Sequence, residues 1–523
     1  MERTPPTNTE DRWERALFLL LLSATLVAVW RVPVFLTQDG PSHLYNARIL
    51  LELWGNDAAG YGRFFTFNTD FSPNWTGNLL LAGSLRLFPA VAAEKVLVSG
   101  YLLLLAFGFR NAVRTMASGT PWLSVLVFVF VFNFHLLYGF YNFCLGLALL
   151  FWAIAAWHRF AAAPSREGAL VGGALMLLLA FTHPVPLVVG LLWAGIVLAP
   201  MVVRAFRTNG PRAILPPLFR ATAAVLPALL FFIVFLPRNG GDHQGLFVDK
   251  LSTTTLKDLL RMEHLLVFPH QERPMFRLLL LAFVVVFVAA LIASKRSRSL
   301  HHAGLLVLLL ASVLVYFFVS DELAGGAYLT SRMALIAWMV FALWAACSPF
   351  SQRAARPLAV GIAIVALALG TVRHVHHRTC AEVAAEHIAQ LKPIGTGAVV
   401  LPLCFSPKGE TASDTLSPRI GLFKHMSGYA AADQRFISLD NYEANTAYFQ
   451  TKWRPRTNPF TQLCASGDCD IEGQPSTADV DGYEQRSDLR VDMLVLWGAP
   501  SRMAADTVFS ARLFSTRLVR RDR

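Results

Sequence analysis

The stretch "TQDGPSHLYNARIL" (37–50) places an acid, a proline and a histidine directly after the first long apolar run of the chain. Asp39, His43 and Ala47 are spaced four residues apart. A helix that begins near Pro41 would carry His43 and Ala47 on one face, with Asp39 at or just before its N-terminus. Two interpretations follow: Asp39 caps a helix at the membrane interface, with His43 as its anchor, or these residues perform acid–base chemistry.

The composition is that of a membrane protein. Of the 523 residues, 55% are hydrophobic and only 15% are charged, and the mean hydropathy is +0.48. Soluble domains usually contain about 25% charged residues. Most of this chain must therefore face lipid or a core embedded in lipid.

The net charge of +12 is unevenly distributed along the chain. Residues 1–372 hold 28 Lys and Arg against 17 Asp and Glu, whereas residues 373–523 hold 18 against 17. The excess lies in the apolar part, where cations mark the cytoplasmic connections between membrane helices. The charge thus indicates membrane topology and argues against a nucleic-acid partner.

The apolar runs predict about eleven transmembrane helices, because a span needs about 20 mostly apolar residues. The runs at 120–157 and 168–203 are each too long for one helix, so we divide them at "YGFYN" and "THPVP", where Gly, Pro and Asn supply turns. The predicted spans are approximately 15–36, 89–109, 120–137, 141–157, 168–182, 185–203, 221–237, 276–293, 302–319, 333–350 and 357–372.

The cations between these spans predict the orientation. With a cytoplasmic N-terminus, every inner connection carries at least two cations, and the short outer turns carry none or one. We therefore expect a multi-pass protein of the cell inner (plasma) membrane with its C-terminal region outside. The inner cations are Arg110 and Arg114; Arg159 and Arg166; Arg204, Arg207, Arg212 and Arg220; Lys295, Arg296 and Arg298; and Arg353 and Arg356.

The chain changes character after residue 372. Polar residues and turns become frequent, "GAVVLPL" and "LRVDMLVLWG" are typical of buried strands, and "CAEVAAEHIAQL" is typical of an amphipathic helix. We predict a transmembrane domain over 1–372, whose outer loop 37–88 carries Asp39, and an extracytoplasmic α/β or α+β domain over 373–523.

The cysteines fit this division. Cys144 and Cys347 fall within spans, where cysteine is usually a small apolar side chain. Four cysteines fall in the outer domain, in a compartment that permits disulfides. Two of these, Cys464 and Cys469 in "CASGDC", are close enough in sequence for a local disulfide, with a zinc site as the alternative.

The architecture and the motif together resemble the GT-C superfamily of membrane glycosyltransferases, which includes protein mannosyltransferases and aminoarabinose transferases. Shared features are a cytoplasmic N-terminus, one helix, an acid at the start of a long outer loop, many spans and an outer C-terminal domain. The family motif is an Asp-Glu pair followed, at this spacing, by Tyr or His and then Ala. Here it reads Asp39, Gly40, His43 and Ala47, with Gly40 in place of the second acid.

The resemblance implies inverting transfer of a hexosyl or pentosyl group from a polyprenyl-phosphate-sugar donor to a lipid, glycan or protein acceptor at the outer face. Asp39 would deprotonate the acceptor hydroxyl, with His43 as the second catalytic residue. The leaving phosphate needs cations or hydrogen-bond donors. No cofactor is required by the sequence, and Gly40 puts a divalent metal at this pair in doubt.

Seven other residues reach the same outer face and are candidates for substrate binding. Four of them have a structural alternative: an interfacial turn for Asn74 and Trp75 in "SPNWTGN" (72–78), a hairpin residue for His183, and a membrane-interface anchor for Arg332. The candidates are Arg48, Asn74, Trp75, Tyr141, Asn142, His183 and Arg332.

Two other classes of function are compatible with the sequence. A transporter or lipid-linked-glycan flippase would carry polar sites within its spans, whereas the polar clusters here lie at the outer face. A non-catalytic membrane scaffold would present the outer domain to an envelope partner. Substitution of Asp39 distinguishes both from an enzyme.

Overall fold

A computed structural model describes most of the chain. The described residues are 8–70, 72–117, 121–235, 246–294, 300–323, 326–410, 415–463, 475, 477–498 and 516–520. Its contacts divide the chain into two compact units. Unit 1 comprises Met1–Ala28, Gly100–His135 and Asn142–Arg373, and unit 2 comprises Val29–Ser99, Leu136–Tyr141 and His374–Arg523. The predicted division into membrane and extracytoplasmic domains stays a prediction.

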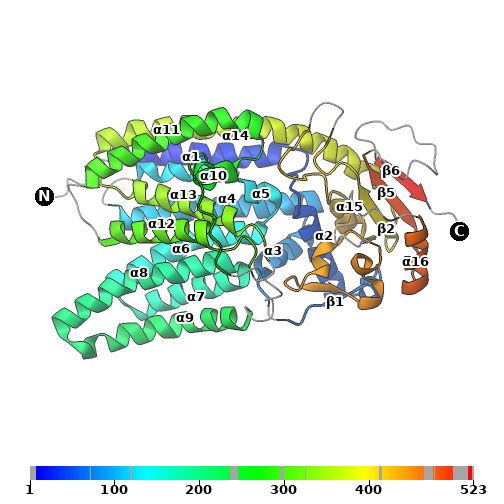
Figure 1. Cartoon of the computed structure of the whole chain (residues 1–523), viewed down its shortest axis with the longest axis horizontal. Coiled ribbons are helices and arrows are strands. Elements are labelled where there is room, and N and C mark those ends of the chain that lie inside the picture. Colours follow the sequence, from blue (N-terminus) through cyan, green and yellow to red (C-terminus); the bar gives the residue numbers. More distant parts are fainter. Residues whose placement is uncertain are drawn as a thin grey trace. The chain divides into compact units, whose positions relative to one another are not determined.

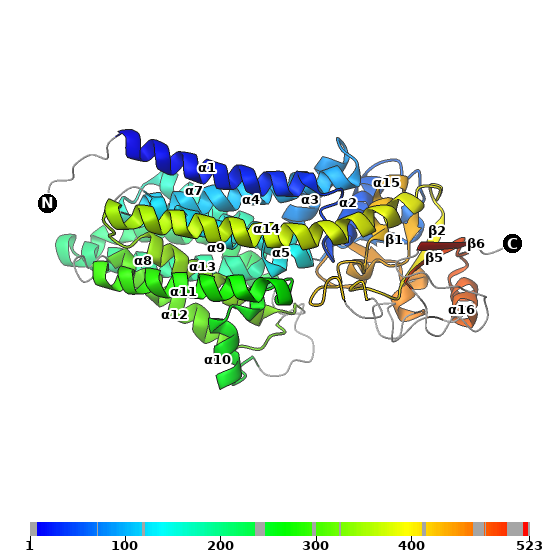
Figure 2. The ribbon, with the colours of Figure 1, turned by 90° about the horizontal axis from the view of Figure 1, so that it is seen from above.

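Three long helices each contribute several residues to both units: α1 (Asn8–Arg31), α4 (Ala90–Met116) and α14 (Gln352–Gln390) (Figure 2). The other long helices belong to unit 1 apart from the first residue of α6 (Figure 1). They are α6 (Tyr141–Ala162), α7 (Arg166–Thr182), α8 (Pro184–Asn209), α9 (Leu215–Phe235), α11 (Pro269–Ser294), α12 (Leu300–Phe318) and α13 (Leu329–Ala346).

This is a polytopic α-helical membrane protein, as predicted. In the described ranges, eight helices are long and apolar enough to cross a membrane, and the segments Trp122–Tyr138 and His302–Phe318 are shorter apolar helices. Both predicted hairpins are present: Gly139, at φ +98°, precedes α6, and His183 separates α7 from α8. The total of eleven spans stays a prediction.

The third predicted span is not one α-helix. Trp122–Val129 forms a 3-10 helix, and α5 covers only Phe134–Tyr138. This stretch, "WLSVLVFV", is rich in β-branched and aromatic residues, which lose side-chain freedom in an α-helix. All of its residues are buried, so packing against their neighbours also bears on the conformation.

An ion pair inside unit 1 joins α14 to α11. The guanidinium of Arg373 binds Glu272 through two 3.0 Å hydrogen bonds, and the Glu272 carboxylate also accepts from the amides of Val267 and Phe268 at 3.1 Å. Arg373 is 4% exposed and Glu272 is 0% exposed. Each of these buried charges would destabilise the folded protein if its partner were removed, because it would remain buried without compensation.

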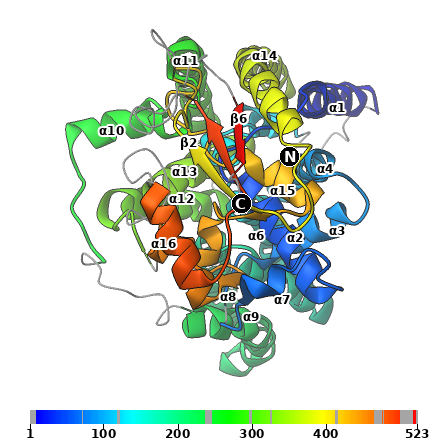
Figure 3. The same ribbon diagram turned by 90° about the vertical axis from the view of Figure 1, so that its right-hand side faces the viewer.

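Unit 2 combines α2 (Gly40–Trp54) and α3 (Trp75–Leu85) with the C-terminal region (Figures 1 and 3). A four-stranded sheet has the order β3-β2-β5-β6, in which β2 pairs in parallel with β3 and β5, and β6 pairs antiparallel with β5. The strands are β2 (Val399–Cys404), β3 (Ile437–Ser438), β5 (Met493–Trp497) and β6 (Thr516–Arg520). The two predicted strands are β2 and β5, whose nearly continuous burial is typical of central strands.

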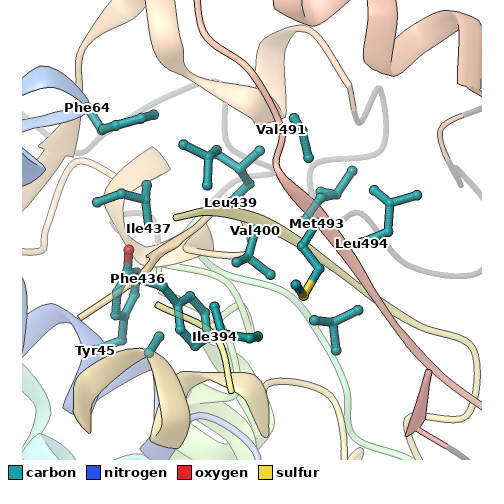
Figure 4. Packing of buried hydrophobic residues seen from close by; sticks show 14 of the residues in the cluster. Tyr45, Phe64, Ile394, Val400, Phe436, Ile437, Leu439, Val491, Met493 and Leu494 are labelled. Atoms are coloured by element: carbon teal, nitrogen blue, oxygen red, sulfur yellow. The ribbon is translucent and has the colours of Figure 1, made fainter. Parts of the chain in front are cut away.

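Segments far apart in sequence share one core in unit 2. β1 (Phe65–Phe67) pairs antiparallel with β4 (Thr451–Trp453). Figure 4 shows Tyr45 of α2 in the same hydrophobic cluster as Val400, Ile437 and Met493 of the sheet. The loop after α1 and the C-terminal region are therefore packed as one body. The remaining helices of this region are α15 (Ser427–Gln434) and α16 (Thr477–Ser487).

The described cysteines are free thiols. Cys144, Cys347 and Cys380 are buried, and Cys404 at the end of β2 is half-buried. Cys464 and Cys469, with the predicted disulfide, lie outside the described residues.

We expect Arg373→Ala to destabilise the protein by about 3–5 kcal/mol, because it leaves the Glu272 charge buried without its partner. The matched control is Arg378→Ala on the same helix, which removes an exposed pair with Glu382 and costs about 0.3–0.5 kcal/mol. Thermal unfolding of the full chain in detergent compares the two. Equal stability losses would contradict the structural role of the Arg373 pair.

Candidate active site around Asp39

Asp39 occupies the N-cap position of α2, as the spacing predicted, but its side chain makes no capping hydrogen bond. The Thr37 hydroxyl accepts instead from the Gly40 amide at 3.1 Å. The first turn of α2 contains Pro41, whose fixed φ suits that position. The interpretation of the Asp39 side chain as a helix cap is therefore wrong, and its carboxylate is available for another role.

The Asp39 carboxylate is held in place with few hydrogen bonds. In the described part of the chain, the one donor to it is the Gln38 amide, at 3.1 Å. The other end of that amide accepts from the Gly421 backbone N–H at 2.9 Å, which fixes the Gln38 side chain. Burial raises the pKa of Asp39, and the positive charges of His425 and His43 oppose this shift. A carboxyl with a raised pKa is a better base than an ordinary aspartate.

His43 lies one helical turn after Asp39 and is buried between two acceptors. Its Nε2 is 3.0 Å from the Gly139 carbonyl, and its Nδ1 is 2.8 Å from the Glu443 carboxylate. The imidazolium form provides an N–H at both ring nitrogens. Burial lowers the pKa of His43, but Glu443 and Asp39 outweigh burial, so the pKa is raised. The site therefore favours a cation at His43.

A second carboxylate–imidazole pair stands near Asp39. Nδ1 of His425 is 2.9 Å from the Asp440 carboxylate, and its ring stacks on Tyr442 with centroids 5.0 Å apart. Burial lowers the pKa of His425, whereas Asp440, and to a smaller extent Asp39, raise it, with a net upward shift. Asp39 is thus flanked by two imidazoles, each held by its own acid.

One face of α2 carries Asp39, His43 and Asn46, which are spaced four and three residues apart. The Asn46 amide bonds the side chain of Asn441 through both of its ends, at 3.3 and 3.0 Å, and donates to Glu443. Asn46, Asn441 and Glu443 are almost completely buried. This network fixes the Glu443 carboxylate against His43.

Glu94 of α4 occupies the space beside Gly40. Its carboxylate accepts from the hydroxyls of Tyr141 and Tyr429, and the Thr37 hydroxyl lies 2.9 Å from that of Tyr141. A Cβ atom at Gly40 would lie 2.2 Å from a Glu94 oxygen and 2.2 Å from the Thr37 hydroxyl. Residue 40 therefore has no room for a second acid, and the neighbouring carboxylate comes from another helix.

The segment before α6 also approaches the start of α2 closely. The amides of Gln38 and Asp39 donate to the carbonyls of Leu137 and Tyr138 at 3.1 and 2.9 Å. Gly139 follows at φ +98°, and a Cβ there would lie 2.7 Å from the Gly40 nitrogen. The hairpin predicted from "YGFYN" thus positions the backbone on which Asp39 stands.

Of the other predicted residues in unit 2, only Tyr141 joins this site, through Glu94 and a ring contact with His43 at 5.6 Å. Arg48 donates to the Ala432 carbonyl at 2.6 Å and lies among Glu52, Asp433 and Arg435. Asn74 precedes α3 in a left-handed conformation, and Trp75 begins that helix; both are half-buried.

The remaining predicted residues lie in unit 1. Arg332 lies over the ring of Phe143, 5.5 Å from its centroid, and His183 contacts the same ring at 5.4 Å. His183 also accepts from the Val185 amide at 3.2 Å, so it caps α8. Asn142 is buried on α6. The structure therefore brings Arg332 and His183 together around one aromatic ring.

Several residues of the Asp39 site were not predicted from the sequence. Glu94 stands near the start of an apolar span, where an intramembrane acid marks a functional site by default. Asp440 and Glu443 fall in the aromatic-rich segment "GYAAADQRFISLDNYEANTAYFQTKWRP" (428–455), in which no local pattern singles out an acid. In the described ranges, no three His, Cys, Asp or Glu side chains are arranged to hold a metal ion.

Comparison with solved structures finds the same fold in ArnT from Cupriavidus metallidurans. The crystal structure bound to undecaprenyl phosphate has a TM-score of 0.51 and 12% identity, and the apo structure has 0.51 and 11%. Each match covers 97% of both chains. No protein-family model and no curated protein matches the sequence. The predicted GT-C-like fold is confirmed.

We expect Gly40→Ala to destabilise the protein by about 1–3 kcal/mol, as overpacking of a filled site does. In an open helical position the same change is stabilising by about 0.4–1 kcal/mol. Gly83 of α3 is such a position, because a Cβ there meets nothing within 4 Å. Thermal unfolding of G40A and G83A should therefore shift in opposite directions. An unchanged or higher Tm for G40A would show that Glu94 does not fill this space.

Proposed function

We propose that this protein is an integral membrane glycosyltransferase that moves a sugar from a polyprenyl-phosphate carrier to an acceptor at the outer face of the membrane. One observation carries the proposal: Asp39 presents a buried carboxylate with a raised pKa at the start of α2, and that carboxylate does not cap the helix. The fold supports it, because ArnT with this fold binds undecaprenyl phosphate. The acceptor is a lipid, a glycan or a protein.

The proposed reaction is a single displacement. The acceptor oxygen attacks the anomeric carbon and forms the new C–O bond while its proton passes to the Asp39 carboxylate. The bond between the anomeric carbon and the phosphate oxygen breaks, and its electron pair leaves with the polyprenyl phosphate. Attack opposite the leaving group inverts the anomeric configuration, and general-base assistance of this kind contributes about 10²–10⁴-fold.

The imidazolium groups of His43 and His425 supply positive charge near the reacting carboxylate. Each is kept cationic by its own acid, Glu443 at 2.8 Å and Asp440 at 2.9 Å. Cations of this kind stabilise the charge that develops on a leaving phosphate. We assign them this role, with Tyr141 as the residue that links His43 to Glu94.

Arg332, His183 and Asn142 remain our candidates for donor binding, with Arg48, Asn74 and Trp75 as further candidates. Arg332 suits a phosphate best, because a guanidinium binds phosphate oxygens in pairs. The distribution of cations between the helices supports a cytoplasmic N-terminus, with Asp39 on the opposite side of the cell inner membrane.

We expect Asp39→Asn to lower the transfer rate about 10²–10⁴-fold, because the amide cannot accept the acceptor proton. The assay measures undecaprenyl phosphate released from mannosyl-, glucosyl- and aminoarabinosyl-phosphoundecaprenol, with extracted envelope lipids and glycans as acceptors. The control is Asp70→Asn, which changes an acid exposed in unit 2 and paired with Lys452.

Correct folding of D39N is checked by its thermal unfolding. Full product formation by D39N would remove Asp39 from the base role. A transporter or a scaffold requires no release of undecaprenyl phosphate, so the wild-type chain would give none with any donor.

The pH dependence of kcat/KM provides a second test. Activity should fall as the pH falls through the pKa of Asp39, which burial places above the value of about 3.9 for an ordinary aspartate. His425→Gln removes a cation that lowers this pKa, so the acid limb should move to higher pH. An acid limb that moves to lower pH, or does not move, would contradict the arrangement of charges around Asp39.

A further inference from the structure

A basic cavity lies in unit 1, among residues that the reaction does not use. It has a volume of about 700 Å³ and is lined by residues of α1, α4 and α6. Arg15 stands at the start of the apolar run of α1, whereas Asp39 follows the end of that run. On the predicted topology the cavity therefore opens on the cytoplasmic side.

Four arginines line this cavity: Arg15, Arg110, Arg114 and Arg159. Arg110 is buried and paired with Glu14, and its guanidinium lies over the Phe18 ring, 4.6 Å from the centroid. It therefore serves the packing of α1 on α4. The other three arginines are exposed, and across the described ranges none of them pairs with a carboxylate. Three arginines that have no carboxylate partner among the described residues thus line one cavity.

Arg159 is oriented by its neighbours on α4. One of its terminal nitrogens donates to the Thr115 hydroxyl at 2.9 Å and to the Asn111 side-chain oxygen at 3.3 Å. A guanidinium has five N–H donors, so most of them remain for a ligand. Holding Arg159 in one orientation before binding reduces the entropy that a ligand must offset.

The rest of the cavity wall is apolar and continues onto the outside of the helices. Leu19 is 50% exposed and Phe107 is 39% exposed. Trp152 is fixed by a 3.0 Å hydrogen bond from its indole to the Leu104 carbonyl. Leu19 and Phe107 belong to helices that are candidate membrane spans, so these exposed side chains suit a hydrocarbon chain. A soluble phosphate would make no use of this wall.

We propose that this cavity binds one anionic phospholipid of the cytoplasmic leaflet. Its phosphodiester headgroup engages Arg114, Arg159 and Arg15, and an acyl chain lies along Leu19 and Phe107. Basic pockets between membrane helices on the cytoplasmic side bind anionic headgroups by this combination of charge and apolar contact. The lipid is a bound structural partner, and the proposal does not depend on the transfer reaction.

The test is native mass spectrometry of the full chain in detergent, titrated with phosphatidylglycerol. Arg114→Gln with Arg159→Gln should weaken binding of the first lipid about 25-fold, since each cation contributes about fivefold near an anionic lipid. The control is Arg204→Gln with Arg207→Gln, which removes the same charge from exposed positions on α8, outside the cavity. The control should bind the first lipid as tightly as the wild type.

Three further ligands identify the source of the phosphate. Phosphatidylcholine, whose headgroup has no net charge, should bind at least tenfold more weakly than phosphatidylglycerol. Glycerophosphoglycerol, which is the headgroup without acyl chains, and inorganic phosphate should not compete. Competition by either soluble ligand, equal binding of both phospholipids, or equal loss in the control pair would each overturn the proposal.

Discussion

The buried contact between His43 and Glu443 is the interaction on which the site depends. It joins the start of α2 to a segment 400 residues later in the chain, and both side chains are almost completely excluded from solvent. The buried Glu443 carboxylate is tolerated because His43 pairs with it and the Asn46 amide donates a hydrogen bond to it. Since α2 and the C-terminal strands also share one hydrophobic core, this polar contact sets where α2 sits within that core.

The electrostatics around Asp39 follow from that placement. The paired acid raises the pKa of each imidazole against the effect of burial, and the positive charges of His425 and His43 in turn limit how far burial raises the pKa of Asp39. The Asp39 carboxylate does not cap α2, because the Thr37 hydroxyl accepts the hydrogen bond from the Gly40 amide instead. Thr37 therefore holds the start of the helix, and the Asp39 carboxylate is left for the role that we propose for it.

Gly40 stands where the resemblance to the GT-C motif would place a second acid. The space beside it is filled by Glu94, which the hydroxyls of Tyr141 and Tyr429 bind. Two carboxylates therefore still stand near the start of α2, but they come from different helices. Glu94 is fully partnered by hydroxyl groups, so it holds the local structure while Asp39 remains available for chemistry.

The sequence alone determined the features that depend on local patterns: the apolar runs, the hairpins at Gly139 and His183, the start of α2 at Asp39, and two central strands. These follow from hydropathy, periodicity and turn chemistry over short windows. Only the tertiary structure decided the partners of that helix, because Glu94, His425 and Glu443 lie 51 to 404 residues away from Asp39 and His43 in the sequence. It also decided that "WLSVLVFV" forms a 3-10 helix, because hydropathy identifies an apolar segment but does not distinguish a 3-10 helix from an α-helix.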